Sequence, residues 1–540
     1  MSGSQRHPLI LWAGITSLGT LASRVLGMIR DMATAALLGM SGSPVMDAFV
    51  VAFRIPNLFR RLFGEGALTA SYVPVLAARL EKDRTGAWQL VSVGLVWLCV
   101  LLAGVVLAAE GVCAVIYALW GGSAGMSLLV GLTAVMMPYM LLVCVAAQVA
   151  ATLQCLSHFA IPALAPTLLN VCWLAAIWGI APWFAPDQQA QAYVLAGSIL
   201  VAGVLQLAVQ WPKLIALGFR FQYRWQAVRG SLYEIVQAMG PMILGLAITQ
   251  INTLMDSLIA WGLSASPDGP QEIAWLGGVR YPMQQGAASA IYYGERLYEF
   301  PLAIVGIAVA TAIFPLLSRH AARGDRRALG ADLTLGLRLV VFLGVPASLG
   351  LGLLAEPLAR LLFQRGEFTP ADTVRAARMI AGYAAGVWAF CALPVVVRGY
   401  YALGDRITPV RIGAGVVGLN FLLNLILIWP LAEAGLAVST SIAAAVQLLV
   451  LIAVLRRRAV PLVWRPLAGT GARTVIATAA MTLAGYLVLG LIPSPVNLSG
   501  KLAQVFVPFA ACVCVYVVTH RLLGGRDLRM AFGRPEQRQP

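Results

Sequence analysis

Residues 8–38 read PLILWAGITSLGTLASRVLGMIRDMATAALL, an apolar run of 31 residues that also contains Arg24, Arg30 and Asp31. About 20 apolar residues are enough to cross a bilayer as a helix. No small-residue cleavage site follows a short apolar core, so we interpret the run as a retained first span. A charge at mid-bilayer costs roughly 2.5–3.5 kcal/mol on insertion scales. Such charges therefore indicate a wet internal cavity for a charged cargo.

The composition of the whole chain is that of a membrane protein with many spans. Its 540 residues are 60% hydrophobic and 11% charged, and the mean hydropathy is +0.83. Soluble domains have roughly 25% charged residues. We predict an all-α polytopic membrane protein with about 14 transmembrane helices, near 8–38, 45–78, 88–118, 126–154, 160–184, 191–212, 232–263, 286–317, 330–355, 371–403, 408–429, 434–455, 467–492 and 500–520.

Lys and Arg are distributed unevenly between alternate loops. With a cytoplasmic N-terminus, 23 of the 38 lie on the cytoplasmic side and 4 in outer loops. Since cytoplasmic loops carry the excess of Lys and Arg, we predict a multi-pass protein of the inner (cytoplasmic) membrane with both termini in the cytoplasm. The net charge of +16 then mostly reflects topology. We interpret the basic tail after Arg521 as a topology anchor, with contact to anionic lipid as the alternative.

Several classes of function are disfavoured. The basic residues lack an aromatic-lined groove, so we predict no nucleic-acid partner. The eight cysteines form no CxxC pair, and we interpret them as small core residues, without disulfides or a metal site. The four histidines have no partner spacing, and there is no nucleotide-binding motif. We therefore predict a transport protein and not an enzyme.

Two pairs of segments recur at nearly one offset. Residues 69–79 (TASYVPVLAAR) are similar to 311–319 (TAIFPLLSR), and 153–162 (LQCLSHFAIP) to 401–409 (YALGDRITP). The prolines of the two pairs are 241 and 247 residues apart. Chance similarity of apolar text around proline is one explanation. The favoured one is a duplicated half of six spans, whose even span number gives both halves the same orientation.

The duplication predicts two parallel-related six-helix lobes around a central cavity. Residues 1–217 form the N-terminal lobe with spans 1–6, and 218–458 form the C-terminal lobe with spans 7–12. Residues 459–524 add two C-terminal helices, and 525–540 are a basic cytoplasmic tail.

Eleven charged residues lie in or beside the first, second and eighth spans. They are Arg24, Arg30, Asp31, Asp47, Arg54, Arg60, Arg61, Glu65, Glu295, Arg296 and Glu299. Arg24 and Asp31 are seven residues apart, on one helix face, and Arg61 and Glu65 have the i, i+4 spacing of an ion pair. The planar fork of Arg matches phosphate and carboxylate. The cluster therefore favours a phosphorylated or carboxylated amphiphile as cargo.

Two alternatives stay open for the polar residues inside the spans. One alternative concerns three charged residues, which either contact the cargo or form ion pairs that lock helices together. They are Arg60, Arg61 and Glu65. Four oxygen-bearing residues form a possible cation site, with interhelical hydrogen bonding as the favoured alternative. They are Asp256, Asn420, Asn424 and Thr440.

Five long motifs resemble a known family. They are SRVLGMIRD (23–31), DAFVVAFRIPNLFRRLFGEGALTASYVPVL (47–76), IPALAPTLLN (161–170), ERLYEFPLAIVGIAVATAIFPLLSR (295–319) and GYYALGDRITPV (399–410). With them the chain resembles, over essentially its whole length, the MurJ (MviN) family. These are lipid II flippases of the multidrug/oligosaccharidyl-lipid/polysaccharide exporter superfamily.

The resemblance implies alternating-access movement of undecaprenyl-diphosphate-linked disaccharide-pentapeptide to the outer leaflet, for peptidoglycan synthesis. Together with the spacing it assigns substrate binding to Arg24, Arg30, Asp31, Asp47 and Arg296. It assigns gate or cavity roles to Arg54, Arg60, Arg61, Glu65, Glu295 and Glu299. The last two spans would form a groove for the lipid tail.

The resemblance also bears on coupling and partners. Some relatives bind sodium where Asp256, Asn420, Asn424 and Thr440 stand, but here Asn424 replaces an expected acid. We expect no cofactor, and coupling to Na+, to H+ or to the membrane potential stays open. Lipid II and membrane lipids are the expected partners of a monomer that meets the cell-wall synthesis machinery. A cation-coupled exporter of drugs or of another lipid-linked oligosaccharide is the alternative function.

Overall fold

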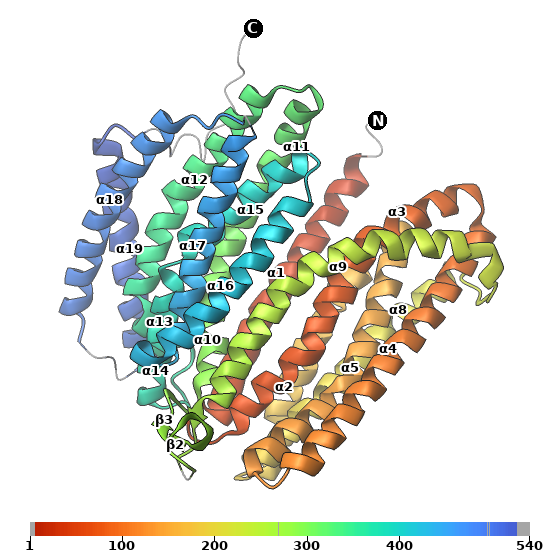
Figure 1. Ribbon diagram of the computed structural model, residues 1–540, viewed down its shortest axis with the longest axis horizontal. Coiled ribbons are helices and arrows are strands. Elements are labelled where there is room, and N and C mark those ends of the chain that lie inside the picture. The colour runs from red at the N-terminus through yellow and green to blue at the C-terminus, as the bar shows by residue number, and fades with distance from the viewer. Residues whose placement is uncertain are drawn as a thin grey trace. The chain divides into compact units, whose positions relative to one another are not determined.

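The computed structural model describes residues 6–525 and 527, except 268, 459, 494 and 496. In this part of the chain the regular structure is helical apart from four strands of two residues each (Figure 1). The chain divides into two compact units. Unit 1 comprises Met1–Trp261 and Arg365–Phe368, and unit 2 comprises Gly262–Gln364 and Thr369–Pro540.

Unit 1 holds the helices of the first half of the chain. They are α1 (Arg6–Leu38), α2 (Val45–Phe59), the π-helix η2 (Arg60–Gly66), α3 (Ala67–Lys82), α4 (Arg84–Trp120), α5 (Ala124–Cys155), α6 (Ala160–Leu164), α7 (Thr167–Ala175), the π-helix η3 (Ala176–Ile180), the 3₁₀ helix η4 (Ala181–Phe184), α8 (Gln188–Ala216) and α9 (Trp225–Gly262).

Helix α2 lies inside unit 1. Residues 45–53 are all buried, as expected for a helix that is apolar on every side. The rings of Phe49 and Phe53 each meet the Trp173 ring of α7 edge-on, with centroids 5.3 Å apart. This packing places α2, which carries Asp47 and Arg54, in the interior of unit 1.

Unit 2 holds the remaining elements. They are β1 (Ser264–Ala265), β2 (Glu272–Ile273), the 3₁₀ helix η5 (Ala274–Leu276), β3 (Val279–Arg280), β4 (Met283–Gln284), α10 (Ala287–Pro301), the π-helix η6 (Leu302–Ile307), α11 (Ala308–Ala322), α12 (Arg326–Leu353), α13 (Ala355–Leu362), α14 (Pro370–Ala384), α15 (Val387–Ala402), α16 (Ile407–Leu431), α17 (Ala434–Arg457), α18 (Trp464–Leu491) and α19 (Leu498–Leu522).

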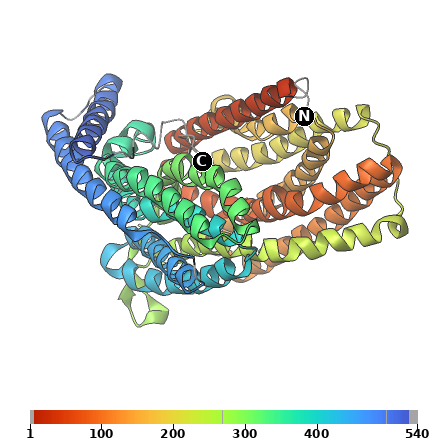
Figure 2. The ribbon, with the colours of Figure 1, turned by 90° about the horizontal axis from the view of Figure 1, so that it is seen from above.

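The core of unit 2 lies between α11, α12, α15 and α17. It includes Leu317, Leu333, Val395 and Leu451, none of which is exposed. Helices α18 and α19 lie side by side and pack on α12 at the edge of the unit (Figures 1 and 2). There the Tyr516 hydroxyl donates to the Phe342 carbonyl over 2.5 Å.

Residues 264–286 form two small sheets. Strands β1 and β4 pair in parallel, and β2 and β3 pair antiparallel. Arg375 of α14 holds the end of this segment, because its guanidinium donates to the carbonyls of Gln284 (3.2 Å) and Gln285 (2.7 Å). The same side chain forms an ion pair with Glu433 at 2.6 Å.

The predicted class, an all-α polytopic membrane protein, is confirmed. In the described part ten helices are long and apolar enough to cross a membrane, or twelve if each of two bent helix pairs is one span. The other two predicted spans coincide with α1 and with α2, η2 and α3. The count of fourteen stays a prediction, and the predicted tail lies almost wholly outside the described residues.

The boundary between the units differs from that of the predicted lobes. We expected the first lobe to end at residue 217, whereas unit 1 continues through α9 to Trp261. Side chains of unit 1 form hydrogen bonds to α9. Arg79 donates to the Ser231 hydroxyl over 3.0 Å, and Arg54 donates to the Thr253 carbonyl over 3.1 Å. The predicted lobe boundary and the duplication both stay predictions.

Candidate substrate-binding site

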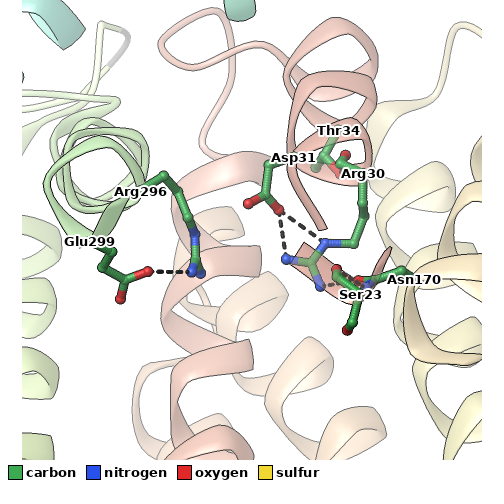
Figure 3. Close-up of polar contacts among 7 residues, drawn as sticks. All are labelled: Ser23, Arg30, Asp31, Thr34, Asn170, Arg296 and Glu299. Carbon is green, nitrogen blue, oxygen red and sulfur yellow. Dashed lines mark hydrogen bonds and ion pairs between the residues drawn. The ribbon is translucent and has the colours of Figure 1, made fainter. Parts of the chain in front are cut away.

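Arg30 of α1 is a buried cation with several partners in unit 1. Its Nε and Nη2 donate to one carboxylate oxygen of Asp31, over 3.0 and 2.7 Å (Figure 3). Its Nη1 donates to Oδ1 of Asn170 over 3.0 Å, and its guanidinium lies 4.5 Å from the centroid of the Trp173 ring. Only 7% of Arg30 and 2% of Asp31 are exposed. Without Asp31 the buried guanidinium would be strongly destabilising, because a buried charge is tolerated only when it is paired.

Asn170 of α7 fixes the orientation of Arg30. Its amide nitrogen donates to the carbonyl of Ser23 over 3.0 Å, while its oxygen accepts from Arg30. Both ends of the amide are therefore bound to α1. This contact ties two helices of unit 1 together at the site (Figure 3).

Arg24 and Asp47 lie in different surroundings. The side chain of Arg24 is exposed, and no hydrogen bond or ion pair joins it to another described residue. Asp47 lies in the first turn of α2 and is 2% exposed. Asp31, which the sequence places on the same helix face as Arg24, forms its ion pair with Arg30.

Arg54, Arg60 and Arg61 line the end of α2 and the start of η2. Arg60 donates to Oδ1 of Asn57 over 2.9 Å, and Arg61 donates to Oε1 of Gln250 over 3.4 Å. With the bond from Arg54 to the α9 backbone, these contacts hold the arginine side chains along unit 1. All three side chains are partly exposed.

The segment that contains Arg61 and Glu65 is a π-helix. Its i→i+5 bonding differs from the α-helical i, i+4 geometry that we assumed for this pair. The side chain of Glu65 lies outside the described part. The predicted pair therefore stays a prediction.

The charged residues of α10 belong to unit 2. Nη1 of Arg296 lies 3.2 Å from Oε2 of Glu299, and these side chains are 25% and 42% exposed (Figure 3). The guanidinium of Arg296 also lies over the ring of Tyr292, 4.6 Å from its centroid. Glu295, one residue earlier, is half-buried. The pair is accessible and can exchange partners.

The four residues of the predicted cation site fall into both units. In unit 2, the Asn420 amide donates to the Thr440 hydroxyl over 3.2 Å, and the Ser439 hydroxyl donates to Asn424. Asp256 belongs to unit 1, where it is buried. The bonds between α16 and α17 are of the interhelical kind that we favoured. No group of three or more His, Cys, Asp or Glu able to hold a metal occurs among the described residues.

Comparison with known proteins identifies the family. The family model described as "Lipid II flippase MurJ" matches residues 34–506. The chain belongs to the lipid II flippase MurJ family. A "Probable lipid II flippase MurJ" of Vibrio cholerae is 35% identical over 485 residues, which is 87% of each chain. A "Lipid II flippase MurJ" of Burkholderia cenocepacia is 33% identical over 455 residues, 82% of each chain.

Solved structures show the same fold as this MurJ family member. The structure titled "Lipid II flippase MurJ, inward closed conformation" has a TM-score of 0.73 at 20% identity, covering 94% of this chain and 99% of that one. An inward-facing multidrug resistance MATE family transporter has a TM-score of 0.63 at 12% identity, covering 81% and 95%. At these identities the likeness concerns the fold alone.

Neutral residues that no sequence pattern singled out hold the arginines of this MurJ family member. Asn170, Trp173, Gln250 and Thr253 are all contacts of Arg30, Arg54 or Arg61. Asn170 was detectable, because it is a polar residue in an apolar stretch. The contact of Trp173 had no signal in the sequence, because a Trp in a span usually indicates packing.

The arrangement separates two kinds of arginine. Arg30 is buried and tied to Asp31 and Asn170, so it is held in a neutral ion pair with a fixed orientation. Arg24 is exposed, and Arg296 is partly exposed beside Glu299. Guanidinium groups of this second kind can offer their forked donors to an anionic headgroup.

Proposed function

We propose that this chain moves lipid II from the inner to the outer leaflet of the cytoplasmic membrane for peptidoglycan synthesis. The observation that carries the proposal is the family match over residues 34–506. The buried Arg30–Asp31–Asn170 group and the accessible Arg24 and Arg296 support it. A diphosphate offers the charged oxygens that such side chains bind most strongly.

The roles of the charged residues follow from their burial and bonds. Arg30, paired with Asp31 and held by Asn170, fixes the packing of α1 and α7 at the site, and Arg24 and Arg296 contact the diphosphate or the peptide carboxylates. Arg54, Arg60 and Arg61 exchange bonds to neutral oxygens for stronger charge-assisted bonds when the cargo arrives. Asp47 and the acids at 65, 295 and 299 balance the arginines when the cargo has left.

We also propose the setting in which the chain works. Both termini face the cytoplasm, the protein acts as a monomer beside the cell-wall synthesis machinery, and it carries out transport without covalent chemistry. The cycle is alternating access, with the lipid tail held by α18 and α19. The membrane potential, worth about 2.3 kcal/mol per charge per 100 mV, can reset the cationic site. Na+ or H+ coupling is the alternative source of energy.

The test measures lipid II at the outer face of cells that are depleted of other flippases. The wild-type chain should restore outer lipid II, and Arg24→Ala should lower its rate of appearance about ten-fold or more, since a charge-assisted hydrogen bond contributes about 1.5–3 kcal/mol. Arg220→Ala removes an exposed loop arginine and serves as the matched control. A wild-type chain that restores no lipid II contradicts the proposed function. A fully active, normally expressed Arg24→Ala variant contradicts only the assignment of Arg24.

A further inference from the structure

A basic cavity lies at one end of unit 2, away from the residues discussed above. It is a partly open cavity of about 660 Å³ between the α11–α12 turn and the segment that joins α17 to α18. Its lining includes Arg326, Arg327, Arg456, Trp464 and one acid, Asp325. The loops that form it carry the arginines that predict the cytoplasmic side of the membrane.

Residues 460–462, which line this cavity, are packed closely on α12. The backbone nitrogen of Val463 donates to the Thr334 hydroxyl of α12 over 3.0 Å. Gly330 of α12 lets the loop approach closely, because a Cβ at this position would lie 2.1 Å from the carbonyl oxygen of Pro461. Val460 and Leu462 are buried against the core. Residues 460–463 of the joining segment are therefore packed closely against α12.

The charge of the cavity is positive. Asp325 uses one carboxylate oxygen to cap α12, accepting from the backbone nitrogen of Ala328 over 2.9 Å. Arg326 donates to the carbonyl of Arg458 over 3.0 Å, which leaves its charge uncompensated. No hydrogen bond or ion pair joins the Arg327 side chain to another residue of the described chain. Three guanidinium groups against one carboxylate favour an anion.

An aromatic ring supports one of these arginines. The guanidinium of Arg456 lies 5.1 Å from the centroid of the Trp464 ring. Trp464 and Val463 are each 44% exposed at the start of the apolar helix α18. Tryptophan at the end of a span lies at the depth of the lipid headgroups. A ligand of this cavity therefore contacts the arginine side chains and also the exposed ring of Trp464.

We propose that this cavity binds the phosphate group of an anionic phospholipid. Basic pockets between membrane helices on the cytoplasmic side bind lipid headgroups, and the exposed Trp464 of the lining suits a lipid more than a free phosphate ion. The site lies within unit 2 and does not depend on the flippase function. Binding of the lipid would stabilise the ends of α12, α17 and α18 that form the cavity. The stability of these ends would then depend on the anionic lipid content of the membrane.

The test is native mass spectrometry of the full-length protein in detergent, titrated with phosphatidylglycerol, phosphatidylcholine or sodium phosphate. Phosphatidylglycerol should bind at least five-fold more tightly than phosphatidylcholine. The double variant Arg327→Gln/Arg456→Gln should weaken phosphatidylglycerol binding about thirty-fold, and Arg327→Gln alone about five-fold, as expected for about 1 kcal/mol per charge. The matched control is Arg323→Gln/Arg457→Gln, which removes the same charge from exposed neighbours that do not line the cavity.

Each outcome decides the proposal. Retention of binding in the control pair together with loss in the cavity pair supports it. Equal loss in both pairs overturns it, because general surface charge then explains the binding. Competition by millimolar sodium phosphate with no preference for phosphatidylglycerol also overturns it, in favour of a soluble phosphate site. The single variant keeps the test valid if the double variant fails to fold.

Discussion

At the scale of single residues, the main feature of this protein is how each buried charge is compensated. Arg30 and Asp31 are neighbours in the chain, and Asn170 and Trp173 are brought to them by the packing of α7. A lone guanidinium at this depth would be strongly unfavourable, whereas a paired and hydrogen-bonded one is tolerated. The site thus holds a guanidinium in the interior as part of a neutral, hydrogen-bonded pair.

The contact of Asn170 with Arg30 gives a prediction about transport and stability. Asn170→Leu keeps the size of the side chain but leaves the buried Nη1 of Arg30 without its acceptor. We expect the free energy of unfolding to fall by about 1–3 kcal/mol, the cost of a buried unsatisfied donor. Outer-leaflet lipid II should appear several-fold more slowly. Thermal melting in detergent and the cell-based lipid II assay measure the two effects.

Thr34→Val is the matched control for this prediction. Its hydroxyl donates to the Arg30 carbonyl over 2.8 Å, on the same turn of α1, and makes no contact with the guanidinium. Its removal should lower the free energy of unfolding by about 0.5–1.5 kcal/mol, the usual contribution of a neutral hydrogen bond. The rate of lipid II transport should stay unchanged. If Asn170→Leu transported lipid II as fast as Thr34→Val does, Asn170 would not position Arg30 for function.

At the scale of elements, the hydropathy of the chain predicts where the helices lie. It does not predict the π-helical segments and breaks within them. Every predicted span coincides with helical structure. The π-helices η2, η3 and η6 lie inside spans that we treated as continuous, and α13 separates from the end of α12. Hydropathy does not distinguish π-helical from α-helical turns, because both carry the same apolar side chains within a span.

The small sheets of residues 264–286 give a prediction at this scale. Arg375→Gln removes the ion pair with Glu433 and the charge-assisted bonds to the carbonyls of Gln284 and Gln285. Bonds of this kind contribute about 1.5–3 kcal/mol each, so local opening should increase about ten-fold or more. Limited proteolysis within 264–286 should accelerate accordingly. The control is Arg378→Gln on the same helix, whose exposed side chain holds no part of the segment, and equal cleavage in both variants would refute the anchoring role.

At the scale of the whole molecule, the orientation in the membrane gives a further prediction. Alkaline phosphatase fused after Pro540 should be inactive, and a fluorescent protein at the same place should be bright, because the positive-inside rule puts this end in the cytoplasm. Alkaline phosphatase inserted at the exposed Gly277–Gly278 turn should be active. The opposite pattern would contradict the topology that follows from the 23 and 4 basic residues of the two sides.

The sequence predicted the fold class and the family, and also which residues are charged within the spans. It did not predict that α9 belongs to unit 1. The bonds from Arg54 and Arg79 to this helix join residues about 150 to 200 positions apart, for which no local pattern exists. It also proposed an ion pair between Arg61 and Glu65 from α-helical spacing, although this segment is π-helical.

The amino-acid order alone determined which segments enter the membrane and where the unusual charges of residues 8–65 stand. Those properties are local, because the free energy of transfer into a bilayer adds up residue by residue along a helix. The tertiary structure decided the partners of Arg30, Arg54 and Arg61 and the boundary between the units. It also brought Arg326 and Arg456 to one cavity across 130 residues of chain. These depend on the directions of side chains in packed helices, which arise only when distant segments meet.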